Sequence, residues 1–297
     1  MKELTVADQY ITEEGMQDLW NVWYSELHDS TSGLTLRIDR TLESLQSDFQ
    51  RIDVIENGDF GKLLVLYGSL MICENDHNAY NEMITHVPLF THPSPRRVLI
   101  IGGGDCGALT EVMKHPEVHE CTMCEIDEKV VEISKRHFPG HTRGLDDPRA
   151  KLIIADGKKF VEESKEKFDL IILDLSDPIG PAADLFQKEF HQLVFDRLND
   201  NGIMVAQSES PYYNKETVKA MYANLRQIFP VVRMYTCFMP IYPSGYWSFA
   251  YCSKGLDPVE DIEMDRIAEL SLDTQYYNLD IHYGAFSLPE FVRRLVR

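Results

Sequence analysis

The pattern of hydrophobic and polar positions changes near residue 72. Before it, the alternation over 34–38 and the stretches 48–56 and 62–67 are typical of strands, with Gly58, Gly61 and Gly68 at turn positions. This predicts a small antiparallel β region that follows a helix-prone segment. After residue 72, short apolar runs alternate with helical patterns. Such alternation predicts a parallel sheet with helices on both faces.

The strands of this second sheet are predicted at 98–101, 119–125, 151–155, 169–174, 202–207, 231–237 and 246–252. The clearest helix covers 214–229, where apolar residues recur at helical spacing and Pro230 follows. We therefore expect an α/β protein with an N-terminal β domain over 1–72. A mostly parallel sheet domain is expected over 73–297.

Charge and composition narrow the function classes. The 297 residues include 29 Lys and Arg against 48 Asp and Glu, a net charge of −19. This excess disfavours a nucleic-acid partner and is compatible with cationic substrates, although solubility alone also explains it. No apolar run approaches the roughly 18 residues of a membrane span, and the polar, acidic N-terminus is unlike a signal peptide, so no membrane partner is expected.

The six cysteines predict a reduced, cytoplasmic protein, because most lie in apolar stretches. Cys121 and Cys124 form a C-x-x-C sequence, but within a strand residues three apart point to opposite faces. The ten histidines show no metal-ligand spacing. The sequence therefore predicts neither a redox pair nor a metal site.

The segment 98–125 carries the first candidate chemistry. Gly102, Gly104 and Gly107 fit G-x-G-x-x-G after an apolar run, and Glu125 follows roughly 20 residues later. This Rossmann-like layout predicts an adenosine-containing ligand, with the acid on the ribose hydroxyls. A carboxylate at Asp105 would repel the pyrophosphate of a dinucleotide. It suits a positively charged ligand instead, such as an adenosyl sulfonium bearing an amine.

Further acids follow the predicted strands, at the edge where such sheets bind ligands. The strand-end acids are Asp105, Glu125, Asp156, Asp174, Asp177 and Glu209. Asp174 and Asp177 precede a Pro- and Gly-containing loop that either covers a pocket or holds ordinary turn acids. Asp156 with Gly157 is either a helix cap or an adenine contact. Tyr80, on a predicted helix, is either a pocket wall or core, and Tyr242 lies in a Tyr-Pro-Ser-Gly turn.

Together these motifs resemble those of the polyamine aminopropyltransferases, above all the spermidine synthase branch. The matching positions include 49–53, 80, 82–83, 86–89, 92–93, 102–105, 124–127, 147–149, 156–157, 174, 177–178, 180–182, 185–186, 242–245, 276–278, 282, 285–286 and 288–289. The resemblance implies a methyltransferase-type Rossmann-like domain and a homodimer or homotetramer formed through the N-terminal region. It implies transfer of the aminopropyl group of decarboxylated S-adenosylmethionine to a diamine such as putrescine. The products are spermidine and 5'-methylthioadenosine, and the donor is a co-substrate, so no cofactor is expected.

The resemblance also implies residue roles. The implied donor-binding residues are Gln50, Gly102, Gly104, Asp105, Glu125, Asp156, Gly157 and Pro181. The implied base is Asp174, and the implied acceptor-binding residues are Tyr80, Asn81, Asp177 and Tyr242. The chemistry agrees, because an alkyl amine with a pKa of about 10 is mostly protonated at neutral pH and needs a base before it can attack.

Four positions near the expected pocket depart from the family pattern: Met71, Asn81, Cys106 and Leu175. They leave open a different acceptor, such as agmatine or cadaverine, and S-adenosylmethionine itself as donor. Asp105 would oppose the carboxylate of that donor. More distant alternatives are a methyltransferase on the same fold and a binding protein that has lost turnover.

Overall fold

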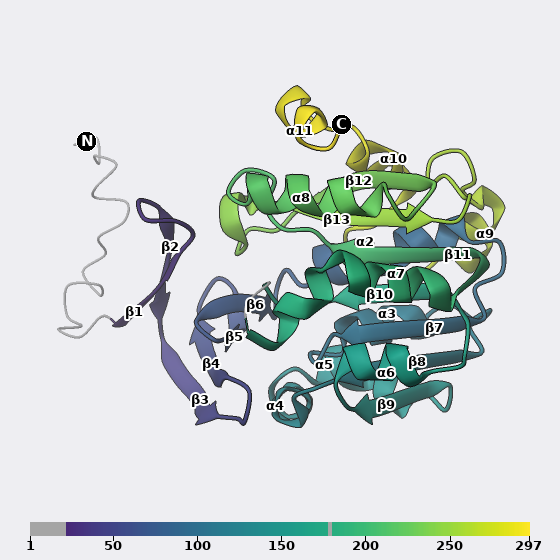
Figure 1. The fold of residues 1–297 in the computed structure, drawn as a ribbon. Helices are drawn as coiled ribbons and strands as arrows, with labels where there is room; N and C mark the ends of the chain where they lie inside the picture. The colour runs from purple at the N-terminus through teal and green to yellow at the C-terminus, as the bar shows by residue number, and fades with distance from the viewer. Residues whose placement is uncertain (1–21, 178–179) are drawn as a thin grey trace, which may run out of the picture.

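The computed structural model describes residues 22–177 and 180–297 and contains three sheets (Figure 1). Two antiparallel sheets form the N-terminal part. The first pairs β1 (Val22–Leu27) with β2 (Gly33–Ile38). The second has, in order, β3 (Arg40–Gln46), β4 (Arg51–Asn57), β5 (Gly61–Leu66) and β6 (Ser69–Cys73). The predicted antiparallel β region is thus confirmed, and the division into domains 1–72 and 73–297 stays a prediction.

The third sheet has seven strands in the order β12-β13-β11-β10-β7-β8-β9. Their bounds are β7 (Arg97–Gly102), β8 (Glu120–Glu125), β9 (Ala150–Ile154), β10 (Phe168–Asp174), β11 (Leu198–Gln207), β12 (Val231–Phe238) and β13 (Tyr246–Ser253). The strands from β7 to β11 pair in parallel, whereas β13 runs antiparallel to both of its neighbours. The short turn at Tyr242–Gly245 explains this reversal, because parallel neighbours need a long crossover.

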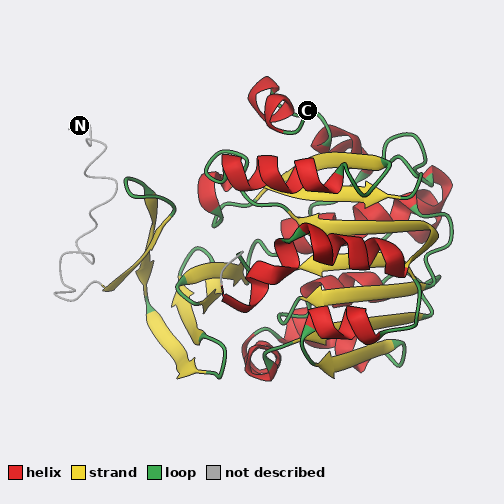
Figure 2. Cartoon of the chain, viewed as in Figure 1, coloured by secondary structure: helices red, strands yellow, loops and turns green. Residues whose placement is uncertain are grey.

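Helices cover both faces of this sheet (Figure 2). They are α2 (Asn78–Thr91), α3 (Gly107–Met113), α4 (Glu128–His137), α5 (Pro139–Thr142), α6 (Gly157–Glu163), α7 (Lys188–Arg197), α8 (Lys215–Leu225), α9 (Met264–Leu270), α10 (Leu279–Ala285) and α11 (Glu290–Leu295), with short 3₁₀ turns at η2 (Arg143–Asp146), η3 (Gly180–Phe186) and η4 (Pro243–Gly245). None of the helices in the described residues is long and apolar enough to cross a membrane.

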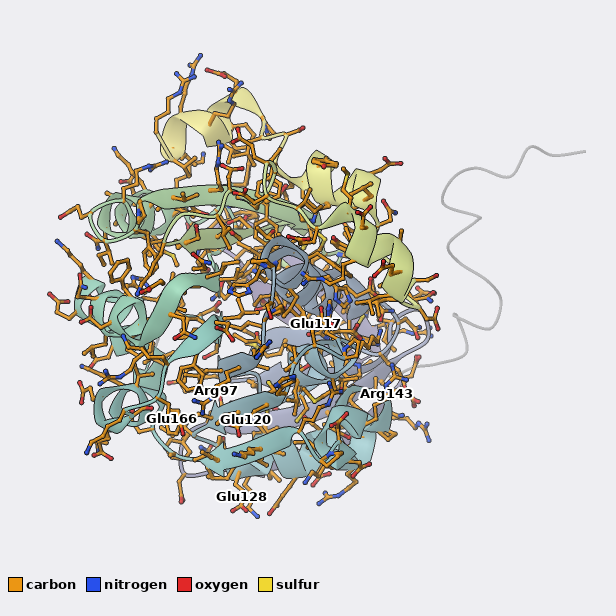
Figure 3. The ribbon with its side chains drawn as sticks, turned by 90° about the vertical axis from the view of Figure 1, so that its right-hand side faces the viewer. Arg97, Glu117, Glu120, Glu128, Arg143 and Glu166 are labelled. Carbon is orange, nitrogen blue, oxygen red and sulfur yellow. The ribbon has the colours of Figure 1, made fainter. Side chains whose placement is uncertain are left out.

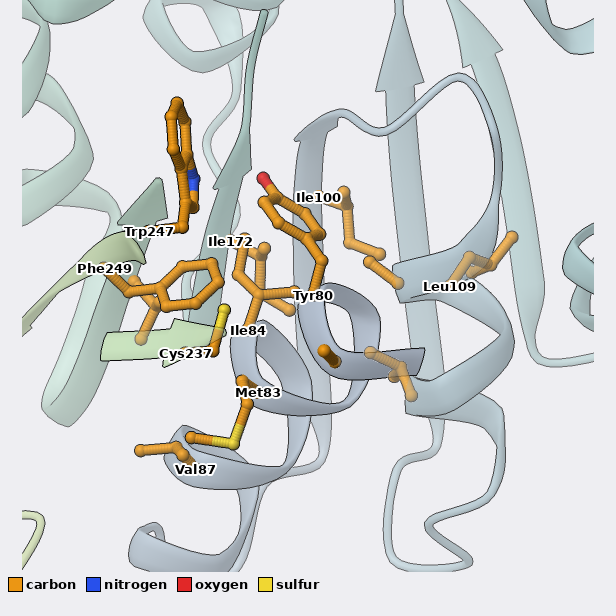
Figure 4. Packing of buried hydrophobic residues seen from close by; sticks show 14 of the residues in the cluster. Tyr80, Met83, Ile84, Val87, Ile100, Leu109, Ile172, Cys237, Trp247 and Phe249 are labelled. Carbon is orange, nitrogen blue, oxygen red and sulfur yellow. The ribbon is translucent and has the colours of Figure 1, made fainter. Parts of the chain in front are cut away.

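Successive strand residues enter two separate cores. Val98 and Ile100 of β7 pack on the α2–α3 side, and Leu99 packs on the side of α6, α7 and α8. Figure 4 shows how α2 presents its apolar side chains to the first core. Cys121 and Cys124 of β8 likewise lie in different cores, which confirms that they do not form a pair.

Several element predictions were incomplete. Strands β1, β3 and β6 were not predicted, and residues just before β2 form β1; the rest of the helix-prone segment lies outside the described residues. β4 begins at Arg51, later than expected, because the hydroxyl of Ser47 accepts the backbone N–H groups of Phe49 and Gln50 and closes a turn. The helix expected over 214–229 ends at Leu225 and is followed by turns.

The two ends of the parallel strands differ in charge pairing. At the amino ends, Arg97 bonds to Glu166 at 2.7 Å and to Glu120 at 3.4 Å, so acids there have cationic partners (Figure 3). The carboxyl ends carry the predicted strand-end acids and point toward the N-terminal sheets (Figure 2). Any site built from these acids therefore lies between the two parts of the chain.

The turn that follows β7 requires glycine. Gly102 pairs with Asp174 across β7 and β10 and has a φ of +82°. A Cβ atom at Gly102 would lie 2.1 Å from the carbonyl oxygen of Asp174. The backbone of Gly103 donates to that same oxygen at 2.9 Å. The glycine turn therefore fixes how closely β7 approaches Asp174.

We expect Gly102→Ala to lower the free energy of unfolding by about 3 kcal/mol or more, because left-handed strain and steric overlap add. Gly68→Ala is the matched control: Gly68 has a φ of +88° but open space around its Cβ position. It should lose only about 1 kcal/mol. Urea denaturation of both variants measures the difference, and equal losses would contradict the close approach.

Candidate active site

A cavity of about 440 Å³ lies at the carboxyl ends of β7, β8 and β10, against β5 and β6. The predicted site residues that line it are Gln50, Tyr80, Asn81, Gly102, Gly104, Asp105, Glu125, Asp156, Gly157, Asp174, Asp177 and Tyr242. Pro181 belongs to η3, and its side chain lies outside the described part of the structure. Residues far apart in the sequence thus meet in one place, as their strand-end positions predict.

Asp174 ends β10 at the centre of this cavity. Its Oδ1 accepts a hydrogen bond of 2.7 Å from the hydroxyl of Tyr80, and its Oδ2 is buried without a hydrogen-bond partner among the described residues. Burial, and then the charges of Asp105 and Glu125, raise the pKa of Asp174 to about 7. A carboxylate with a pKa near neutrality and one free oxygen is suited to exchange a proton with a bound ligand.

The two tyrosines form one wall. Tyr80 is 7% exposed, and its ring packs 5.2 Å from that of Phe249 and 5.9 Å from that of Tyr242. Figure 4 shows Tyr80 rising from α2 beside Phe249 and Trp247. Tyr242 donates to the backbone oxygen of Met71 at 2.5 Å, which ties the β12–β13 turn to β6. Tyr80 is therefore both core and pocket wall.

Glu125, at the end of β8, is the centre of a second group of contacts in the cavity lining. Its Oε1 accepts the backbone N–H of Asp127 at 2.8 Å, and burial raises the pKa of Glu125 to about 7. Asp127 in turn accepts bonds from Ser47 at 2.6 Å and from the amide of Gln50 at 3.1 Å. Gln50 thus joins the N-terminal sheet to the end of β8.

Asp156 is a helix cap, which is one of the two roles that the sequence left open for it. It caps α6, and its carboxylate accepts the backbone N–H groups of Lys158 at 2.9 Å and Lys159 at 3.2 Å. The helix-cap interpretation is therefore confirmed, although the residue also lines the cavity. Its neighbour Lys158 bonds to Asp184 at 3.0 Å, and it is the only lysine or arginine among the described residues that line the cavity.

A group of acids, the outer acid cluster, consists of Asp177, Glu26 and Glu209. Asp177 lines the cavity, whereas Glu26 and Glu209 lie outside its lining and are close enough to Asp177 to feel its charge. Burial raises the pKa of Asp177, and Ser69 donates to its Oδ2 at 3.4 Å. Burial and the charge of Asp177 raise the pKa of Glu209 to about 8 and that of Glu26 to about 7. Each of these three groups therefore favours a nearby positive charge.

Two members of this cluster were not among the predicted site residues. Glu209 is 2% exposed and has a φ of +67°, and its place after β11 was the only sequence signal. Glu26 accepts the backbone N–H of Leu70 at 2.8 Å across a separation of 44 residues. No local pattern predicts such a contact.

The four departures occupy different places. Met71, Asn81 and Leu175 line the cavity, whereas Cys106 is absent from its lining and is buried in a left-handed conformation with a φ of 66°. Asn81 lies directly against α3, since a Cβ atom at Gly107 would be 2.1 Å from its amide nitrogen. In the described part of the chain, no group of three or more His, Cys, Asp or Glu side chains could hold a metal ion.

Comparisons with known proteins agree on one family. Residues 22–74 match the model of the spermidine synthase tetramerisation domain, and residues 77–261 match that of the spermine/spermidine synthase domain. A polyamine aminopropyltransferase of Caldicellulosiruptor bescii is 43% identical over 93% of this chain and 98% of its own. One from Thermotoga maritima is 40% identical over 95% and 96%.

Solved structures give the same answer. A spermidine synthase in complex with the transition-state analogue AdoDATO has a TM-score of 0.90 and 41% identity, over 93% of this chain and 94% of its own. The spermidine synthase of Thermotoga maritima has a TM-score of 0.89 at the same identity and coverage. The Rossmann-like fold prediction is thereby confirmed.

The raised pKa of Asp174 predicts a pH-dependent stability for the ligand-free protein. The folded value of about 7 lies above the ordinary 3.8, so the free energy of unfolding falls as the pH rises from about 4 to about 7. Asp174→Asn keeps an acceptor for Tyr80 and removes the charge. We expect it to be up to about 4 kcal/mol more stable than the wild type near pH 8 and nearly equal near pH 4, at about 1.4 kcal/mol per pKa unit.

Denaturation at both pH values measures this difference. Asp200→Asn, at an exposed position of β11, is the control and should leave the pH profile unchanged. A stability gain for Asp174→Asn that is the same at both pH values would contradict the raised pKa.

Proposed function

Since the chain belongs to the spermine/spermidine synthase family and is thus an aminopropyltransferase, we propose that it makes spermidine. In this proposal the aminopropyl group of decarboxylated S-adenosylmethionine moves to putrescine, and 5'-methylthioadenosine leaves. The observation that carries the proposal is the excess of buried carboxylates at the strand ends. There Lys158, the one lysine or arginine in the described cavity lining, is paired with Asp184. Such a cavity suits two cationic substrates.

The donor is assigned to the β7–β8 side. Glu125 accepts the ribose hydroxyls through Oε2, because its Oε1 is already bonded to a backbone N–H. Asp105 holds the ammonium of the aminopropyl group as a charge-assisted hydrogen bond. Gly102 and Gly104 let the donor approach the backbone, and Gln50, Asp156 and Gly157 complete the described surroundings. Pro181 is assigned to the donor from the family resemblance alone.

Asp174 is the base in this proposal. The acceptor nitrogen gives up a proton to the free Oδ2, and its lone pair then attacks the carbon next to the sulfonium. The carbon–sulfur bond breaks with its electron pair on sulfur, so the leaving group is a neutral thioether. Tyr80 orients the carboxylate through Oδ1, and Tyr242 walls the acceptor path. Much of the rate then comes from holding two flexible chains in line.

We assign a diamine as the acceptor because a second group of acids, the outer acid cluster, is separate from Asp174. The outer acid cluster has raised pKa values that a second ammonium would relieve. Asp177 faces the cavity, and Asn81 is assigned to the same acceptor region. A diamine thus presents one nitrogen to Asp174 and the other to the cluster.

We assign assembly to the N-terminal sheets. Trp23 and Leu27, on the same face of β1, are 56% and 77% exposed, and large exposed apolar side chains of this kind are typical of an interface. Together with the match to a tetramerisation model, this supports a homodimer or homotetramer. The six free, buried cysteines support a cytoplasmic location.

Mass spectrometry of the products tests the reaction. The purified protein is incubated with decarboxylated or complete S-adenosylmethionine and, in turn, putrescine, agmatine or cadaverine. Spermidine and 5'-methylthioadenosine from the decarboxylated donor and putrescine support the proposal. Preferred turnover of another pair would replace the substrates, and a methylated amine would identify a methyltransferase.

Asp174→Asn should lower turnover by roughly 100-fold or more, the usual scale for loss of a general base. Donor affinity should change much less, because Asp105 and Glu125 remain. In the wild type, kcat/KM should fall as the pH drops below about 7, where Asp174 becomes protonated. The defect of the variant should shrink at high pH, where more of the amine is already neutral. Near-normal turnover of the variant at neutral pH would show that Asp174 is not the base.

Glu209→Gln tests the second ammonium while keeping the size and the contact with Gln207. We expect KM for putrescine to rise about 10-fold, or about 1.4 kcal/mol of binding, with little change in kcat. Butylamine has the same length and no distal ammonium, so its KM should hardly change. Equal effects on both amines would show that Glu209 does not read the distal charge.

A further inference from the structure

A pair of buried histidines stands behind the carboxylate of Asp105. His141 Nδ1 lies 3.4 Å from Asp105 Oδ2, and the His141 side chain is 4% exposed. The ring of His77 lies against it, with 3.7 Å between ring centroids. His77 Nδ1 is in turn 3.5 Å from the amide nitrogen of Asn81. Asp105 and Asn81 line the cavity and the histidines do not, so the pair links two cavity residues from outside its wall.

The contacts define the tautomers. An ionised carboxylate only accepts, so Nδ1 of His141 carries the hydrogen. Nε2 of His141 is buried and has no partner among the described residues, so a second proton there would lack an acceptor. Asn81 donates to Nδ1 of His77, and burial together with His141 lowers the pKa of His77 to about 4. His77 is therefore neutral near pH 7.

The backbone holds His141 in register with Asp105. Its carbonyl accepts the hydroxyl of Thr110, and that hydroxyl also accepts the backbone N–H of Gly144 at 2.9 Å. Thr110 belongs to α3, which begins two residues after Asp105. Histidine and carboxylate are thus both fixed by the start of α3.

We propose that His141 is a positioning residue that orients Asp105 toward the ammonium of the donor. This role rests on the proposed function. Within the described chain, His141 supplies the one side-chain hydrogen bond to Asp105. That bond occupies Oδ2 and leaves Oδ1 for a ligand. The ring of His77 packs against the imidazole of His141 at an interplanar angle of 41° and restricts its movement. The effect of His141 is confined to ligands with an ammonium at this point.

The test compares two ligands by calorimetry: the decarboxylated donor, and methylthioadenosine, which lacks the aminopropyl ammonium. His141→Phe keeps a ring against His77 but has no N–H group. His141→Asn retains an N–H donor near the position of Nδ1. We expect His141→Phe to weaken donor binding about 10-fold and to leave methylthioadenosine binding unchanged, and His141→Asn to restore most of the donor affinity.

His191→Phe is the matched control, because His191 is 1% exposed on α7 and outside the cavity lining. It should bind both ligands as the wild type does. Unchanged donor affinity in His141→Phe, or an equal loss for both ligands, would overturn the positioning role.

The tautomer of His141 can be measured independently of the reaction. A wild-type protein that binds neither ligand would defeat the proposed function. Nitrogen NMR of the imidazoles in the ligand-free protein should then still show His141 protonated at Nδ1, with a signal that moves in Asp105→Asn. Protonation of His141 at Nε2 alone would overturn the inference by itself.

Discussion

The arrangement depends on one unfavourable condition: several carboxylates are buried together, and no unpaired lysine or arginine is found among the described residues around them. Burial raises the pKa values of Asp174 and Glu125 to about 7, and Lys158 is committed to Asp184. Such burial costs free energy that the surrounding structure must supply. The fully buried strand residues of β7 and β10 supply it through packing on both faces. A cationic ligand relieves the same cost, so affinity for cations is built into the empty protein.

The N-terminal sheet creates this condition by covering the strand ends. Without it, the acids after β7, β8 and β10 would face water and keep ordinary pKa values. Three contacts fasten the cover: Gln50 to Asp127, Tyr242 to the backbone of Met71, and Ser69 to Asp177. Each joins segments far apart in the sequence. The sheet that closes the cavity is therefore also the sheet that buries its acids and raises their pKa values.

The features that could be predicted from the sequence are those that depend on a local pattern of residues. Apolar runs located the strands of the large sheet, and strand-end acids marked the edge where Asp174 and Glu125 meet. What it missed depends on contacts made only after folding. The mostly polar, half-exposed strand β3 shows no clear alternation, because only part of it packs on a core. Glu26 and His141 act on lining acids from outside the cavity lining, and both come from segments with no motif.

The same charges bear on the choice of donor. Complete S-adenosylmethionine carries a carboxylate beside the ammonium that Asp105 would hold. At about 4 Å and an effective dielectric constant of about 20, two like charges repel by about 4 kcal/mol, or roughly a thousandfold in affinity. His141 is already bonded to Asp105, and Met71 and Leu175 offer only apolar surface. Among the described lining residues, Lys158 is paired with Asp184, and the amide nitrogens of Gln50 and Asn81 bond to Asp127 and His77. No free cation or amide of this lining is left for that carboxylate, which supports the proposed decarboxylated donor.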